Sequence, residues 1–122
     1  MNMTGFFAAG VLVLATSLAS AQTAAPNDAQ IAAIVVAANQ VDIDAGKLAD
    51  SKSANKEVKA FAKQMVSDHS GVNKAATELV TKLKVTPQEN PTSTSLKKDG
   101  ADTLKRLKGL KGAEFYRSYI DN

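Results

Sequence analysis

Cysteine and tryptophan are absent from this chain of 122 residues, and histidine occurs once. Without cysteine, the chain can form no disulfide bond, no thiolate metal site and no cysteine nucleophile. The single histidine belongs to no recognisable Ser-His-Asp arrangement, so few groups are available for nucleophilic or general-base catalysis. These absences favour a protein that is not an enzyme.

Glycine-rich phosphate loops, strand-like alternation and internal repeats are also missing. Aromatic residues make up only 5% of the chain, while Ala, Lys, Leu and Val dominate, which favours helices over strands. The length suits one domain. Lys and Arg outnumber Asp and Glu by 15 to 12, and this small excess indicates no nucleic-acid partner.

An export signal is the clearest feature of the N-terminus. Residues 6–21 read FFAAGVLVLATSLASA, an uncharged apolar stretch that ends in an A-x-A sequence at residues 19–21. The stretch is shorter than the roughly 20 residues of a membrane-spanning helix. We therefore predict a signal peptide over residues 1–21, cleaved between Ala21 and Gln22, and a mature protein in the periplasm or cell envelope.

A short linker rich in Ala and Thr, residues 22–26, precedes the first predicted helix. Asn27 and Gln30 have the spacing of a capping box, and the helix that follows ends near Ser51. Apolar residues at steps of three and four mark one side of this helix. They are Ile31, Ile34, Val35, Ala38, Val41, Ala45, Leu48 and Ala49.

The second predicted helix has the strongest periodic signal in the chain, and Ser53 or Asn55 can cap it. Because residues 52–55 leave only a short connection, the two helices are expected to form an antiparallel hairpin. The apolar side of the second helix consists of Val58, Phe61, Ala62, Met65, Val66, His69, Val72, Ala76, Leu79, Val80 and Leu83.

The third predicted helix is weaker. Two prolines place residues 85–94 in a loop, so Ser93 or Ser95 would cap the helix, and Gly100 inside it costs about 1 kcal/mol relative to Ala. A new apolar pattern over residues 114–122 predicts the start of a fourth helix.

These elements predict an all-α fold over residues 27–122: an antiparallel helical bundle with two long helices, a weaker third and the start of a fourth. Each helix is apolar on one side only and must bury that side against a neighbour. Because the bundle is incomplete, apolar stripes remain without a partner within the chain. We expect self-association to cover them.

Positive charge is concentrated on the third helix and just after it. The plainest interpretation is a solvated lysine-rich face. The alternative is weak contact with an anionic surface of the cell envelope. The basic residues concerned are Lys97, Lys98, Lys105, Arg106, Lys108 and Lys111.

Asp42, Asp68 and His69 are the candidate metal ligands. Carboxylates and histidines that face a bundle interior can hold a divalent ion such as iron, manganese or zinc. The competing interpretation is a core histidine satisfied by one hydrogen bond. The register along the hairpin also counts against the pair, because it separates Asp42 from His69 by about 7 to 8 Å along the helices.

Residues 42–69, DIDAGKLADSKSANKEVKAFAKQMVSDH, resemble an exported bacterial family, the domain of unknown function 4142. The family's Gly-Lys-Leu-Ala-like stretch, Val-Lys-x-Phe-Ala stretch and Met-Val-x-Asp-His ending are matched at residues 46–49, 58–62 and 65–69. Residues 107–122 resemble its Leu-x-Gly-x-x-Phe-Asp-x-x-Tyr segment. The resemblance implies a ferritin-like helical bundle, in which the acidic and histidine positions would form a metal site.

This chain departs from the family pattern in two ways. Tyr116 stands where the family usually has Asp, and family members continue through two further helices that contain histidine. We therefore expect a C-terminally truncated member. Two functions follow: a non-enzymatic periplasmic or cell-envelope protein with a binding or stress-related role, or a ferritin-like metal-binding or redox protein that uses the Asp and His residues named above.

Overall fold

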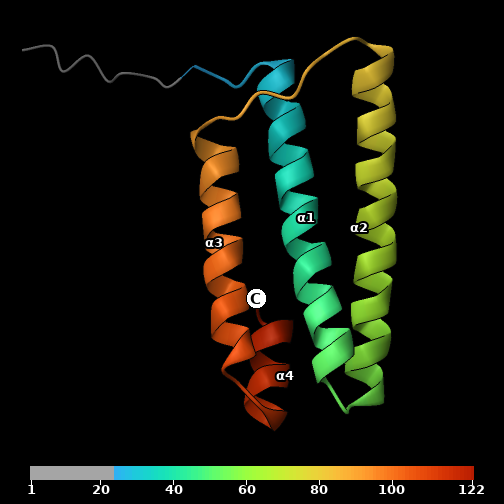
Figure 1. Ribbon diagram of the computed structural model, residues 1–122, viewed down its shortest axis with the longest axis vertical. Coiled ribbons are helices and arrows are strands. Elements are labelled where there is room, and N and C mark those ends of the chain that lie inside the picture. The colour runs from blue at the N-terminus through green and yellow to red at the C-terminus, as the bar shows by residue number, and fades with distance from the viewer. Residues whose placement is uncertain (1–23) are drawn as a thin grey trace, which may run out of the picture.

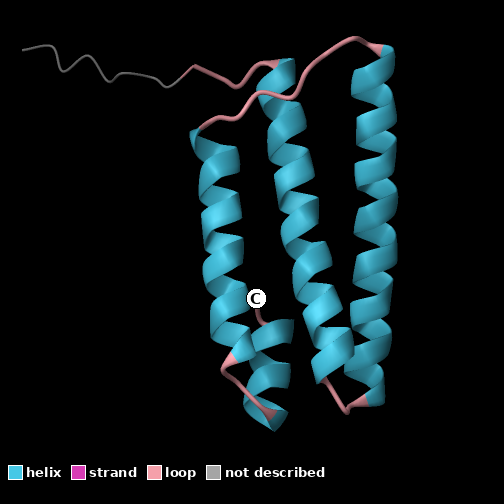
Figure 2. Cartoon of the chain, in the orientation of Figure 1, coloured by secondary structure: helices cyan, strands magenta, loops and turns pink. Residues whose placement is uncertain are grey.

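The structure is a computed structural model that describes residues 24–122 (Figure 1). Within this range the chain forms helices and no strand (Figure 2), which confirms the predicted all-α fold. The helices are α1 (Asp28–Lys52), α2 (Lys56–Lys82), α3 (Pro91–Lys108) and α4 (Gly112–Ile120). No helix in the described part is long and apolar enough to cross a membrane. The predicted signal peptide, residues 1–21, lies outside the described residues.

The three long helices stand side by side, with α1 between α2 and α3 (Figure 1). The α1–α2 hairpin is antiparallel, as predicted. Helix α3 runs parallel to α1, because the connection over residues 83–90 crosses the end of the layer where α1 begins (Figure 1). Helix α4 turns back at the opposite end and covers only that end of the layer. The fold is therefore an open layer with one short covering helix.

Asparagine side chains begin the three long helices. Asn27 and Gln30 form the predicted capping box, and Asn55 caps α2 by accepting hydrogen bonds from two backbone amides. Each cap satisfies N–H groups that have no partner within the helix. The predicted connection between α1 and α2 is thus confirmed, with Asn55 rather than Ser53 as the cap.

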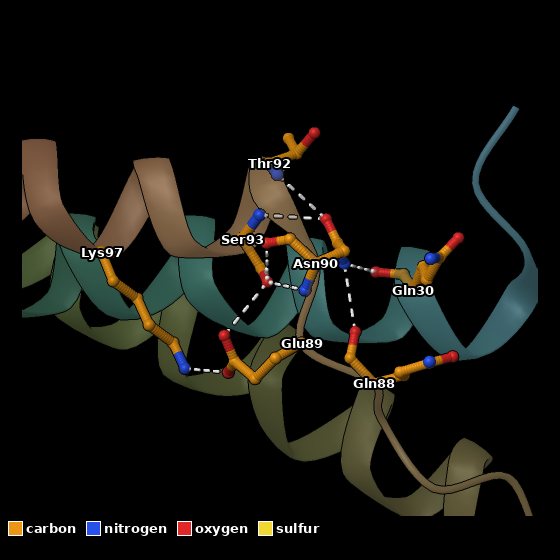
Figure 3. Close-up of polar contacts among 7 residues, drawn as sticks. All are labelled: Gln30, Gln88, Glu89, Asn90, Thr92, Ser93 and Lys97. Atoms are coloured by element: carbon orange, nitrogen blue, oxygen red, sulfur yellow. Dashed lines mark hydrogen bonds and ion pairs between the residues drawn. The ribbon is translucent and has the colours of Figure 1, made fainter. Parts of the chain in front are cut away.

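The predicted cap of α3 is wrong. Asn90 accepts hydrogen bonds from the amides of Thr92 and Ser93, and the Ser93 hydroxyl accepts one from the Asn90 amide (Figure 3). Pro91 occupies the first helical position, where its fixed φ angle fits and its missing N–H does no harm. The loop predicted over residues 85–94 therefore ends at Asn90.

The connection before α3 is attached to the start of α1. The Gln88 amide donates to the Ala29 carbonyl at 2.9 Å, and Asn90 Nδ2 donates to the Gln30 carbonyl at 3.1 Å (Figure 3). The Glu89 carboxylate pairs with Lys97, nearly two turns into the helix. These contacts fix the residue at which α3 starts and hence the axial register of α3 relative to α1.

A glycine at each contact of α1 lets the neighbouring helix approach closely. A Cβ atom on Gly46 would lie 2.9 Å from Val66 Cγ2 and 3.0 Å from the Ala62 carbonyl oxygen of α2. On the other side, Val41 packs against Gly100 of α3, where an added Cβ would lie 2.5 Å from Val41 Cγ2. Gly100 weakens α3 as a helix, but it is the residue that admits α1.

The predicted apolar side of α1 is only partly correct. Ile31 is 45% exposed, whereas Ala33, Ala37 and Ile43, which lie outside that stripe, are buried. A helix placed between two neighbours buries two opposite sides, and a single stripe cannot describe it. The main core lies at the end that α4 covers and consists of Ala45, Ala49, Val58, Ala62, Leu107, Phe115 and Tyr119.

Two glycine-to-alanine substitutions test the close packing of α1 and α2. Gly71→Ala, where an added Cβ meets nothing within 4 Å, should raise the free energy of unfolding by about 1 kcal/mol through helix propensity. Gly46→Ala should lower it by about 1 kcal/mol, because the new methyl group overpacks the contact with Val66 and Ala62. Urea denaturation measures both values, and stabilisation by both substitutions would contradict the packing described.

Candidate functional site

A polar cluster interrupts the apolar contact between α1 and α2. Asn39 of α1 is only 8% exposed. Its Nδ2 atom donates to the Val35 carbonyl at 2.8 Å, and its Oδ1 atom lies 2.7 Å from Nδ1 of His69 on α2. Because Oδ1 can only accept, His69 Nδ1 must carry the proton in this bond. Asn39 thus fixes both the ring orientation and the tautomer of His69.

Asp42 approaches the other nitrogen of the same ring. Its Oδ2 atom lies 3.6 Å from His69 Nε2, and the two side chains are 50% and 28% exposed. The structure brings two of the three candidate ligands together. The predicted axial separation of 7 to 8 Å was wrong.

The positions of the helix ends explain the short distance. Asn39 lies 52 − 39 = 13 residues before the end of α1, and His69 lies 69 − 56 = 13 residues after the start of α2, so they share one level. Asp42 lies three residues, about 4.5 Å, closer to the turn between α1 and α2. Side chains lean towards the N-terminus of their own helix, and in an antiparallel pair this lean brings Asp42 and His69 towards each other.

Asp68, the third candidate ligand, is exposed on α2. Over residues 24–122, no group of three or more His, Asp or Glu side chains is placed to hold a metal ion. The site as it stands therefore supplies a nitrogen and a carboxylate, with Asn39 holding the nitrogen in place.

Tyr119 of α4 adjoins the same carboxylate. Asp42, Met65 and Tyr119 line part of a cavity of about 90 Å³ at the end of α4. Tyr119 is 7% exposed and packs its ring edge-on against Phe61, with 6.1 Å between centroids. Burial raises the pKa of the Tyr119 hydroxyl, and the charge on Asp42 raises it further.

The cluster places two electron-donating groups, a histidine nitrogen and a carboxylate, close to each other. In its neutral form, His69 directs the lone pair of Nε2 towards the Asp42 carboxylate, since the proton is on Nδ1. A nitrogen lone pair and a carboxylate oxygen are both groups that can donate electrons to a divalent cation. Sequence reasoning found Asp42 and His69 but missed Asn39 and Tyr119. For Asn39 there was a signal, since it lies on the same helix side as Asp42 one turn earlier.

Neighbouring groups already engage half of the basic residues predicted to contact an anionic surface. Lys97 pairs with Glu89, and Lys98 pairs with Asp102 at 2.7 Å. The hydrogen bond from Lys98 to Asp102 raises the pKa of Lys98, as does the attraction between their charges. Arg106 donates to Ser118 and to Asn122 of the C-terminal segment. The other three predicted contact residues, Lys105, Lys108 and Lys111, lie outside these interactions.

A large apolar surface remains uncovered on the α1–α2 hairpin. Ile31, Val72, Leu79 and Leu83 are 45%, 48%, 55% and 61% exposed, and we call these four residues the open face. Beside them lies a hollow of about 310 Å³ lined mainly by apolar side chains, Val35 and Val80 among them. All four residues belong to the apolar stripes predicted from the sequence, some of which were expected to lack a partner within the chain, and the layered arrangement leaves them in contact with water.

Comparison with known proteins identifies the family. The model of the family described as a domain of unknown function, DUF4142, matches residues 13–122, and the chain therefore belongs to this family. Neither the curated proteins nor the solved structures contain a match to this chain.

The tautomer of His69 can be tested directly. At a pH where the ring is neutral, ¹⁵N NMR should show the proton on Nδ1, because Asn39 Oδ1 accepts it. Asn39→Leu should shift the proton towards Nε2 and lower the free energy of unfolding by about 1–2 kcal/mol. Asn73→Leu, one turn further along α2, should leave the tautomer unchanged. A neutral ring protonated on Nε2 in the unmodified protein would contradict the assigned hydrogen bond.

Proposed function

We propose that this member of the DUF4142 family is an exported, non-enzymatic protein of the periplasm or cell envelope that acts by binding. The binding surface in this proposal is the open face. One observation carries it: four large apolar side chains are about half exposed on one hairpin beside an apolar hollow. Soluble monomers rarely leave large contiguous apolar patches uncovered, and such patches typically mark interaction sites.

The shape of the open face favours a helical partner. It is formed by two antiparallel helices, and the hollow runs between them with Ile31 on one side and Leu79 on the other. A groove between two helices accepts the apolar side of a third, which docks through residues spaced three and four apart. Burying one half-exposed Leu adds about 1 kcal/mol, so several such contacts could hold a partner.

Binding of an apolar fluorescent dye tests this surface. At protein concentrations low enough to keep the chain monomeric, the unmodified protein, recovered from the periplasm with Gln22 as its first residue, should enhance the dye fluorescence. The double substitution Val72→Lys and Leu79→Lys should remove most of the enhancement, because it places two charges beside the hollow. Ala60→Lys is a matched control at an exposed position on another side of α2. Equal enhancement by all three proteins, with unchanged helical circular dichroism, would count against the open face.

A second candidate function is divalent metal binding in a ferritin-like bundle, through Asp42 and His69. The separation of 3.6 Å between Nε2 and Oδ2 favours it. Two ligands about 2.0–2.1 Å from one tetrahedral ion lie roughly 3.4 Å apart, so a small movement would admit iron, manganese or zinc. A hydrogen bond to the second ring nitrogen, as Asn39 provides, is also typical of metal-bound histidine.

Thermal unfolding in the presence of zinc tests the metal site. Zinc at ten times its dissociation constant should stabilise the protein by about 1.4 kcal/mol, which corresponds to a rise of roughly 5–10 °C in Tm. His69→Ala and Asp42→Asn should abolish this rise in Tm. The rise measured for Asp68→Asn shows whether the exposed Asp68 carboxylate also binds the zinc. If zinc raises the Tm of His69→Ala as much as that of the unmodified protein, the site lies elsewhere.

A further inference from the structure

We propose that the open face binds the same face of a second copy of this chain, turned end over end, so that α4 of each copy fills the hollow of the other. The inference rests on the proposed function, since it names the partner of the open face. It follows from how α4 already packs within one chain.

The open face continues the surface that α4 covers. Residues seven apart lie on one side of a packed helix. On α1 one such row ends at Ala45 and Lys52, and on α2 another begins at Val58 and Met65. Ala45 and Val58 belong to the core cluster with Phe115 of α4, and Lys52 Nζ lies 5.7 Å from the Phe115 ring centroid. The complete rows are Ile31, Ala38, Ala45 and Lys52 on α1, and Val58, Met65, Val72 and Leu79 on α2.

The uncovered part of these rows has the length of a second α4. Tyr119, near the end of α4, reaches the level of Asp42, where the two residues line one cavity. From Asp28 to Val41, fourteen residues of α1 extend about 20 Å beyond it. Helix α4 has nine residues and is about 13–14 Å long. One further helix of this size fits on the open face.

The position of α4 selects the symmetry of the pair. Each hairpin carries a ridge at one end, namely α4, and a hollow at the other end. A twofold axis perpendicular to the helices places each ridge over the hollow of the other copy, whereas an axis parallel to them stacks ridge on ridge. The contact is isologous, so it closes on itself at two copies. Ile120, 51% exposed on α4, then becomes buried against the partner copy.

Self-association measured by sedimentation equilibrium tests the proposal. The purified protein should be a dimer, and Leu79→Lys and Ile120→Lys should each weaken dimerisation by roughly tenfold or more, since each places a lysine in the apolar contact. Ala60→Lys should not weaken it. A monomer at all accessible concentrations would overturn the dimer, and the dye-binding result would still stand or fall separately.

Cross-linking tests the end-over-end arrangement, and the absence of native cysteine makes single cysteine variants specific. The two C-terminal ends of α4 meet near the twofold axis, so Asn122→Cys should be joined between copies by a short bis-maleimide. Lys111→Cys should not be joined, because eleven residues of each α4 segment separate the two thiols by about 33 Å. Cross-linking through Lys111→Cys and not through Asn122→Cys would overturn this arrangement.

Discussion

The close approach of α1 to both of its neighbours is the constraint on which the rest of the structure depends. Gly46 admits α2, and Gly100 of α3 admits Val41 of α1, so neither contact tolerates an added methyl group without displacement. Glycine costs about 1 kcal/mol relative to alanine inside a helix. The chain places it where helices meet, and the close contact fixes the relative level of each pair. The register between α1 and α2 in turn places Asn39 and His69 at the same height along the hairpin.

The same constraint explains where the large apolar side chains lie. Because α1 contacts its neighbours mainly through glycine and alanine, little space remains between the helices for leucine or phenylalanine. Among the described residues, the largest fully buried side chains are Phe115, Leu107 and Ser93, two of them at or near the end that α4 covers. The large apolar residues of α2 instead lie on the side of the hairpin that α4 partly covers. Phe61 contacts α4 there, whereas Leu79 remains exposed. The open face is thus a direct result of the close packing.

Local interactions could be predicted from the sequence, and relations between distant segments could not. The capping box of Asn27 and Gln30 and the hairpin before Asn55 depend on neighbouring residues, and both are confirmed. The prediction of the α3 cap failed because Asn90, Pro91 and Ser93 each satisfy a capping rule, and the contact of the Asn90 side chain with the Gln30 carbonyl of α1 is not readable from the local sequence. The predicted separation of Asp42 and His69 was too large because the helix ends were each placed one residue away and because residue counting ignores the direction in which side chains lean.

Asp42 links the polar cluster to the open face. It lies where the cover provided by α4 ends, with Tyr119 on one side and half of its side chain in water. In the proposed dimer, a second helix continues the cover beyond this point and removes part of that water. The attraction between a carboxylate and a nearby cation strengthens as the surroundings become less polar, provided that the pair remains intact. Covering the open face would therefore tighten the hold of Asp42 and His69 on a shared cation, so that the two proposed binding events support each other through one carboxylate.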